Sequence, residues 1–158
     1  MRLPPDELAG ITDLFGAVRP PALEQGVREL AFRRGTDFDP AAYEESVERA
    51  LDGYHLVSVD LAATDGSVLT AGPTAFPRLP DGAEDLPHIL DIERREVDRE
   101  TVGREVEQRL RGEAARAVAD GDWERATTLL DVTYDLETWA PVEIEQARKH
   151  LDAALDGE

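Results

Sequence analysis

The 158-residue sequence contains no cysteine. This absence excludes disulfide bonds, thiolate metal ligands and cysteine nucleophiles. No apolar run approaches the roughly 20 residues that a membrane-spanning helix needs. The first six residues also lack the apolar stretch of a signal peptide. We therefore expect a cytoplasmic protein with no membrane partner.

Lysine is nearly absent as well: Lys149 is the only one, against 16 arginines. The formal net charge is −18. Short carboxylates hold water and cations well, whereas the apolar stem of lysine suits a salt-exposed surface poorly. At about 1 M salt the Debye length falls to about 3 Å, which screens the self-repulsion of so acidic a chain. The composition thus indicates an acidic, halophilic protein.

Motifs that carry catalysis or cofactors are also missing. The three histidines, His55, His88 and His150, form no pair at metal-ligand spacing, and no glycine-rich phosphate loop or serine elbow occurs. His88 with Asp91 is one imidazole–carboxylate pairing, for which a structural hydrogen bond is the favoured interpretation. We predict no cofactor, no metal and no catalytic residue, and we keep an enzyme of unrecognised type as a third hypothesis.

The first part of the chain has the three-and-four apolar spacing of helices. One helix is predicted to begin at Pro4-Pro5 and to end near Arg19, with Val18 on its apolar face. A second is predicted from Pro20-Pro21 to Gly35, and a third from Asp39-Pro40 to Tyr54. Alternation in residues 55–61, the Asp65-Gly66 turn and residues 67–71 then predict a β-hairpin. This order is typical of a winged helix-turn-helix domain.

The second part of the chain is predicted to be helical. Residues 76–97 hold three prolines and an acidic turn, which disfavour regular structure, yet their apolar residues predict packing against both halves. Helices are then expected after Asp98, after Asp122 and from about Pro141. We therefore predict a mainly α (α+β) chain with a winged-helix-like domain at 1–75, a packed proline-rich connector at 76–97 and a helical hairpin or bundle at 98–158.

Charge separates two possible partners of the first domain. Its third helix would normally enter the major groove, but it exposes Glu44, Glu45, Glu48, Arg49 and Asp52, and Asp60, Thr64 and Asp65 lie in the wing. Arg28, Arg33 and Arg34 cluster at the end of the second helix. They are a candidate surface for nucleic acid or a partner; the alternative interpretation is that they compensate the negative end of the helix dipole. A protein partner is therefore favoured over DNA.

Aromatic residues are expected to pack in the cores. Phe15, Phe32, Phe38, Tyr43, Tyr54 and Phe76 fall in or beside the first domain, and Trp123, Tyr134 and Trp139 fall in the second. Trp139 lies at a helix junction before Ala140-Pro141, which makes it a candidate anchor for a protein partner.

Segments 13–17, 29–35 and 71–91 resemble a family of small acidic haloarchaeal proteins of unknown function. The resemblance implies a haloarchaeal cytoplasm and supplies no catalytic residue. We favour a non-enzymatic protein–protein interaction or regulatory module. A DNA-binding regulator that uses Arg28, Arg33 and Arg34 is the alternative, and the oligomeric state stays open.

Overall fold

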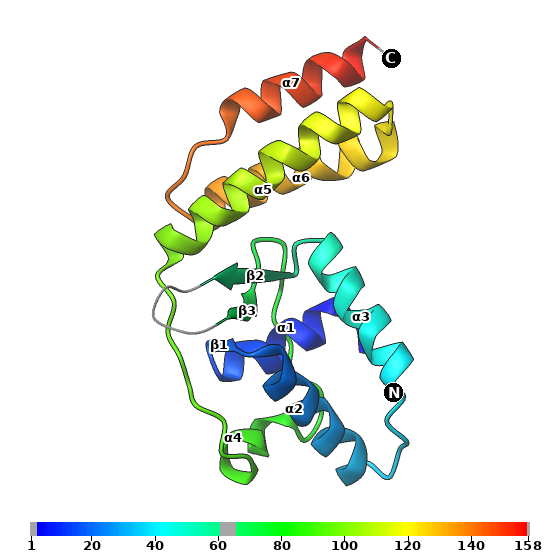
Figure 1. Ribbon diagram of the computed structural model, residues 1–158, viewed down its shortest axis with the longest axis vertical. Helices are drawn as coiled ribbons and strands as arrows, with labels where there is room; N and C mark the ends of the chain where they lie inside the picture. Colours follow the sequence, from blue (N-terminus) through cyan, green and yellow to red (C-terminus); the bar gives the residue numbers. More distant parts are fainter. Residues whose placement is uncertain (1–2, 61–65, 158) are drawn as a thin grey trace. The chain divides into compact units, whose positions relative to one another are not determined.

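The computed structural model describes residues 3–60 and 66–157 (Figure 1). The chain divides into two compact units, Met1–Val97 and Asp98–Glu158. Over the described ranges it contains seven α-helices, one 3-10 turn and one three-stranded antiparallel sheet. The predicted mainly α (α+β) fold class is therefore confirmed. None of the helices in these ranges is long and apolar enough to cross a lipid bilayer.

The first unit opens with three helices. They are α1 (Pro5–Leu14), α2 (Pro20–Arg33) and α3 (Pro40–Asp52). Each has a proline in its first turn, where no intrahelical hydrogen bond is lost. The Asp39 carboxylate also caps α3 by accepting hydrogen bonds from the amides of Ala41 at 3.0 Å and Ala42 at 3.4 Å. The starts of all three helices follow from these residues, as predicted.

The predicted hairpin is present as β2 (Leu56–Asp60) and β3 (Ser67–Ala71). The two strands are antiparallel, with Val59 opposite Val68. Leu61, Thr64 and Asp65, which were expected at the strand end and the wing tip, lie outside the described residues.

A short strand that the sequence did not reveal completes the sheet. β1 (Ala17–Val18) pairs with β3, so the strand order is β1-β3-β2. The prediction that the first helix continues to Arg19 is wrong, because Gly16 takes a φ of +76° and turns the chain out of the helix. The backbone also passes close to Arg95 there, since a Cβ at Gly16 would lie 1.9 Å from the Arg95 carbonyl oxygen. Val18 therefore belongs to a strand.

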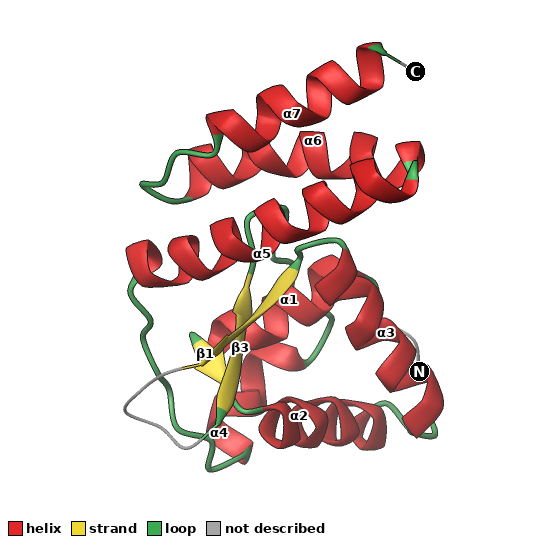
Figure 2. Ribbon diagram, turned by 45° about the horizontal axis from the view of Figure 1, so that its top comes forward, coloured by secondary structure: helices red, strands yellow, loops and turns green. Residues whose placement is uncertain are grey.

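Helix α1 lies at the centre of the first unit, where it packs against β3 and α3, while α2 contacts β3 (Figure 2). The core is apolar and continuous across these elements. Its largest fully buried members are Leu8, Ile11, Leu23, Leu30, Leu56 and Leu86.

The proline-rich segment contributes to this core. It forms a 3-10 turn, η1 (Ala83–Asp85), and a short helix, α4 (Leu86–Ile89), so the expectation of no regular structure is wrong at these residues. Ala83 and Leu86 are fully buried. Leu86 lies against α2 at Gly26, where a Cβ would make an ordinary van der Waals contact of 3.9 Å with Leu86 Cδ1. Burial of two apolar residues explains why this segment folds despite its prolines.

The second unit consists of α5 (Arg99–Asp120), α6 (Trp123–Trp139) and α7 (Glu145–Asp156). α5 packs against α6, and α6 against α7, which confirms the predicted helical hairpin or bundle. Gly121, with a φ of +67°, ends α5, and the Asp122 carboxylate caps α6 by accepting the Arg125 N–H at 3.1 Å. The apolar faces of the helices supply the buried residues Val102, Val106, Leu110, Ala126, Leu129, Val132, Leu136, Ile144 and Leu151.

Candidate functional site

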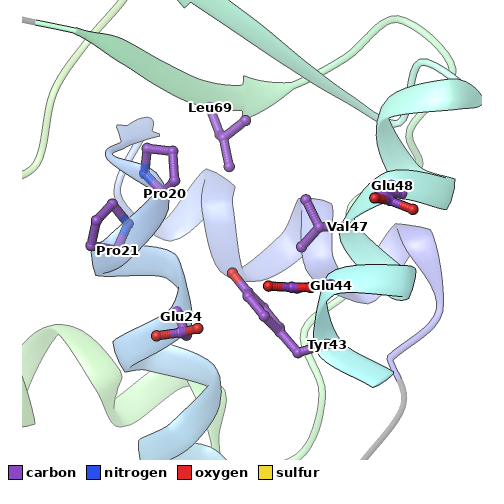
Figure 3. Close-up of a pocket in the computed structure, with 8 residues that line it drawn as sticks. All are labelled: Pro20, Pro21, Glu24, Tyr43, Glu44, Val47, Glu48 and Leu69. Carbon is purple, nitrogen blue, oxygen red and sulfur yellow. The ribbon is translucent and has the colours of Figure 1, made fainter. Parts of the chain in front are cut away.

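A groove of about 550 Å³ lies in the first unit between α2, α3 and β3 (Figure 3). Five of the residues that line it have apolar or aromatic side chains, and the other three are glutamates. They are Pro20, Pro21, Glu24, Tyr43, Glu44, Val47, Glu48 and Leu69. We call this site the α2–α3 groove.

The floor of the α2–α3 groove is apolar. Tyr43 and Val47 lie one turn apart on α3 and extend toward α2, while Leu69 enters the same space from β3 (Figure 3). Tyr43 is 8% exposed and Leu69 4%. Pro20 and Pro21 open α2 and form the facing wall. The bottom of the groove therefore offers hydrocarbon to a bound ligand.

The rim of the groove is acidic. Glu44 and Glu48, one turn apart on α3, are exposed, and Glu24 faces them from α2. Glu24 pairs with Arg28 of the same helix, whose Nε lies 3.5 Å from a Glu24 carboxylate oxygen in a solvent-exposed pair. An exposed pair of this kind leaves most of the negative potential in place. The rim therefore favours cationic ligands.

The chemistry of the groove suits binding. Burial raises the pKa of the Tyr43 hydroxyl, and the Glu24 carboxylate raises it further, so Tyr43 keeps its proton at neutral pH. Among the residues that the structure describes, no histidine, serine or lysine lines the groove. Within residues 3–60 and 66–157, no group of three or more His, Asp or Glu side chains is placed to hold a metal ion. His88 and Asp91, the imidazole–carboxylate pairing considered from the sequence, are both exposed.

The outward face of α3 continues the acidic surface. Glu44, Glu48, Arg49 and Asp52 are exposed, and Arg49 pairs with Glu45 on its own helix at 2.9 Å. Arg49 therefore already forms an ion pair within α3. A phosphate group at this face would meet an excess of negative charge.

The candidate arginines Arg28 and Arg33 lie in the second half of α2, and Arg34 is its C-cap residue. The Arg28 guanidinium stacks on the Phe38 ring at 4.2 Å. Arg33 donates to the Gly82 carbonyl at 3.3 Å and pairs with Asp85 at 3.5 Å, and Arg34 donates to the Asp81 carbonyl at 2.6 Å. These contacts attach the 81–85 turn to α2. The role of Arg28, Arg33 and Arg34 as a binding surface stays a prediction.

Trp139, the candidate anchor, ends α6 in the second unit. Its ring is half-buried, and the Arg99 guanidinium stacks on it at 4.2 Å while donating to the Trp139 carbonyl at 3.0 Å. One face of the ring is therefore occupied by a cation. Its role as a partner anchor also stays a prediction.

Sequence reasoning did not identify the groove, although it assigned most of its residues to elements. Tyr43 was expected only to pack in the core. The available signal was that Glu44 and Glu48 directly follow Tyr43 and Val47, which lie one helical turn apart, and this places acid beside hydrocarbon on α3. Core packing was correctly expected for Phe15 and for Tyr43 and Tyr54, which are buried. The same expectation is wrong for three residues, because Phe32 is 79% exposed, Phe76 82% and Tyr134 53%.

Comparison with known proteins places the chain in a family. Residues 6–156 match a family of unknown function, DUF7109. Since the match spans nearly the whole chain, the protein belongs to this family. No curated protein and no solved structure matches significantly.

Proposed function

We propose that this member of the DUF7109 family is a non-enzymatic protein-binding module with a regulatory role. Its α2–α3 groove accepts an apolar side chain from a cationic segment of a partner protein. The observation that carries the proposal is the combination of a hydrocarbon floor with a rim of three glutamates, of which Glu24 pairs with the exposed Arg28. Apolar burial supplies affinity, and the rim supplies selectivity for basic flanking residues.

In this proposal the first unit is a winged-helix-like domain that binds a protein and not nucleic acid. Its order of helix, strand, helix, helix and hairpin, with a β1-β3-β2 sheet, supports the comparison. In winged helices the third helix normally reads the major groove. Here the equivalent helix, α3, presents Glu44, Glu48 and Asp52 to solvent, so that face favours cations over phosphates.

DNA binding through Arg28, Arg33 and Arg34 is the alternative, and their contacts count against it. Arg33 pairs with Asp85, and Arg34 donates to the carbonyl of Asp81. Phosphate contacts at this edge would compete with the hydrogen bonds that hold the 81–85 turn. A shift of double-stranded DNA by the protein in a gel, abolished by Arg33→Glu with Arg34→Glu, would favour the alternative over the proposal.

We also propose that the protein works in the cytoplasm of a haloarchaeon. The support is compositional: a net charge of −18 and one lysine, Lys149, whose ammonium pairs with Glu145 at 3.3 Å. Self-repulsion of this size should lower the stability of the fold in dilute buffer. Binding is therefore tested both at about 0.1 M salt and at about 1 M salt, where the Debye length is about 3 Å.

The test uses two short synthetic helix-forming peptides that share one central phenylalanine. In one peptide the phenylalanine is flanked by arginines, and in the second, matched peptide it is flanked by glutamates. We expect the cationic peptide to bind more tightly, by fluorescence anisotropy, with a preference that shrinks as salt screens the rim. Glu44→Gln with Glu48→Gln should weaken its binding about fivefold at low salt, since two exposed pairs are lost.

A matched control separates the groove from overall charge. Asp131→Asn with Asp135→Asn removes the same charge at the same spacing from a helix of the second unit, α6. These substitutions should leave peptide binding unchanged. Equal affinity for the two peptides, or equal loss in the two double variants, would refute the groove as the binding site.

A further inference from the structure

Helix α2 exposes a large aromatic side chain beside several arginines. Phe32 is 79% exposed, although the fold places most other large apolar residues of the helix in the core. Arg28 lies one turn before it, and Arg33 and Arg34 follow it directly. We call Phe32 with these three arginines the Phe32 patch. An exposed aromatic ring among cations is unusual on a chain with a net charge of −18.

The Phe32 patch has the chemistry that the α2–α3 groove selects. The groove offers hydrocarbon ringed by Glu24, Glu44 and Glu48, whereas the patch offers an aromatic ring flanked by guanidinium groups. We propose that the groove of one copy receives Phe32 of a second copy, so that the protein self-associates through these two surfaces. This inference rests on the proposed binding role of the groove, and it names the partner as the chain itself.

The two surfaces are placed so that such a contact can close into a dimer. Pro21, Gln25, Arg28 and Phe32 follow the four-three-four spacing of one helix face. Pro21, at the groove wall, and Phe32 are 11 residues apart, or about 16 Å along α2. Two α2 helices that meet antiparallel about a two-fold axis near their middle bring Phe32 of each beside Pro21 of the other. Both contacts form at once, and no surface is left open for further growth.

The arginines of the patch are already held in place. Arg33 contacts Gly82 and Asp85, while Arg28 stacks on Phe38. Their side chains therefore lose less conformational freedom when a second copy binds. Arg28 and Arg33 remain 52% and 37% exposed, but a partner's glutamates share their guanidinium groups with Glu24 and Asp85, so Phe32 supplies most of the affinity.

The test measures the oligomeric state of the full chain by sedimentation equilibrium. Association should strengthen between about 0.05 M and about 1 M salt, because screening removes the repulsion between two acidic copies. Phe32→Ser should weaken dimerisation about 30-fold or more, as expected for an aromatic residue at the centre of an interface. Phe76→Ser, which removes an equally exposed ring after β3, should leave it unchanged.

Mixing two variants tests the pairing itself. Phe32→Ser keeps the groove and lacks the ring, whereas Glu44→Arg with Glu48→Arg keeps the ring and reverses the rim. Each variant alone should be monomeric, and their mixture should form a heterodimer through the one remaining contact. A monomeric wild-type chain at both salt concentrations, equal effects of Phe32→Ser and Phe76→Ser, or no association in the mixture would each overturn the inference.

The two proposals fail separately. The cationic phenylalanine peptide, titrated into the Phe32→Ser chain, tests the groove in the absence of self-association. Binding of this peptide together with a monomeric wild-type chain would retain the groove and eliminate the dimer. A second result would overturn both proposals: the wild type is dimeric, Phe32→Ser dissociates it, and the peptide does not bind the Phe32→Ser chain. Phe32 would then contact a surface other than the groove.

Discussion

Leu86→Ala tests whether the proline-rich segment is part of the unit that carries the groove. Leu86 is fully buried, lies in the same apolar core as Leu23 and Leu30, and approaches α2 at Gly26. Truncation of a leucine in such a site typically removes 2–5 kcal/mol, and we take about 3 kcal/mol here. For a unit of about 100 residues, each 1 kcal/mol lowers the melting temperature by about 4–8 °C. The first unit should therefore melt about 12–24 °C lower.

The measurement is thermal unfolding of the full chain at about 1 M salt, where charge repulsion is screened. Far-UV circular dichroism follows both units. The two tryptophans, Trp123 and Trp139, both lie in α6, so their fluorescence reports the second unit. Leu79→Ala is the control, since Leu79 belongs to the same segment but is 42% exposed. A shift no larger than that of Leu79→Ala would refute the assignment of residues 83–89 to the core of the first unit.

Three further changes test particular contacts. Asp39→Ala removes the cap of α3 and should cost about 1 kcal/mol, or about 4–8 °C in the melting temperature of the first unit, by circular dichroism. Burial raises the pKa of Tyr43 above that of an unfolded tyrosine. The contribution of Tyr43 to folding stability is therefore complete below about pH 10 and is lost as the pH rises further. Urea unfolding should accordingly show a smaller alkaline loss of stability in Tyr43→Phe. Hydrogen bonds from the Ile144 amide and Arg148 lower the pKa of Glu137. The contribution of Glu137 to folding stability is therefore present above the ordinary glutamate pKa and is lost as the pH falls. Glu137→Gln should reduce this loss of stability in acid, which tryptophan fluorescence can follow.

Local signals predicted the helices and the hairpin because each depends on neighbouring residues. Prolines and the Asp39 cap mark the helix starts, and Gly121 with Asp122 marks the junction of α5 and α6. Strand β1 could not be predicted because two residues are too few to show the alternation of a strand. Its position depends on Gly16, and on pairing with β3 about 50 residues later.

The groove could not be predicted for a related reason. Its walls come from three elements that are distant in sequence, so nothing local brings Pro20, Tyr43 and Leu69 together. The exposure of Phe32 was missed because an aromatic residue next to a helical stripe is typically buried. Here the stripe ends at Leu30 and Ala31, and Phe32 lies beyond it, toward solvent.

The most direct test of the α2–α3 groove is an NMR titration of the Phe32→Ser chain with the cationic phenylalanine peptide. The proposal predicts that amide shifts concentrate at Glu24, Tyr43 to Glu48 and Leu69, and that they shrink with the glutamate-flanked twin. Shifts that fall on the second unit, or on the 81–85 turn in place of the groove, would contradict it.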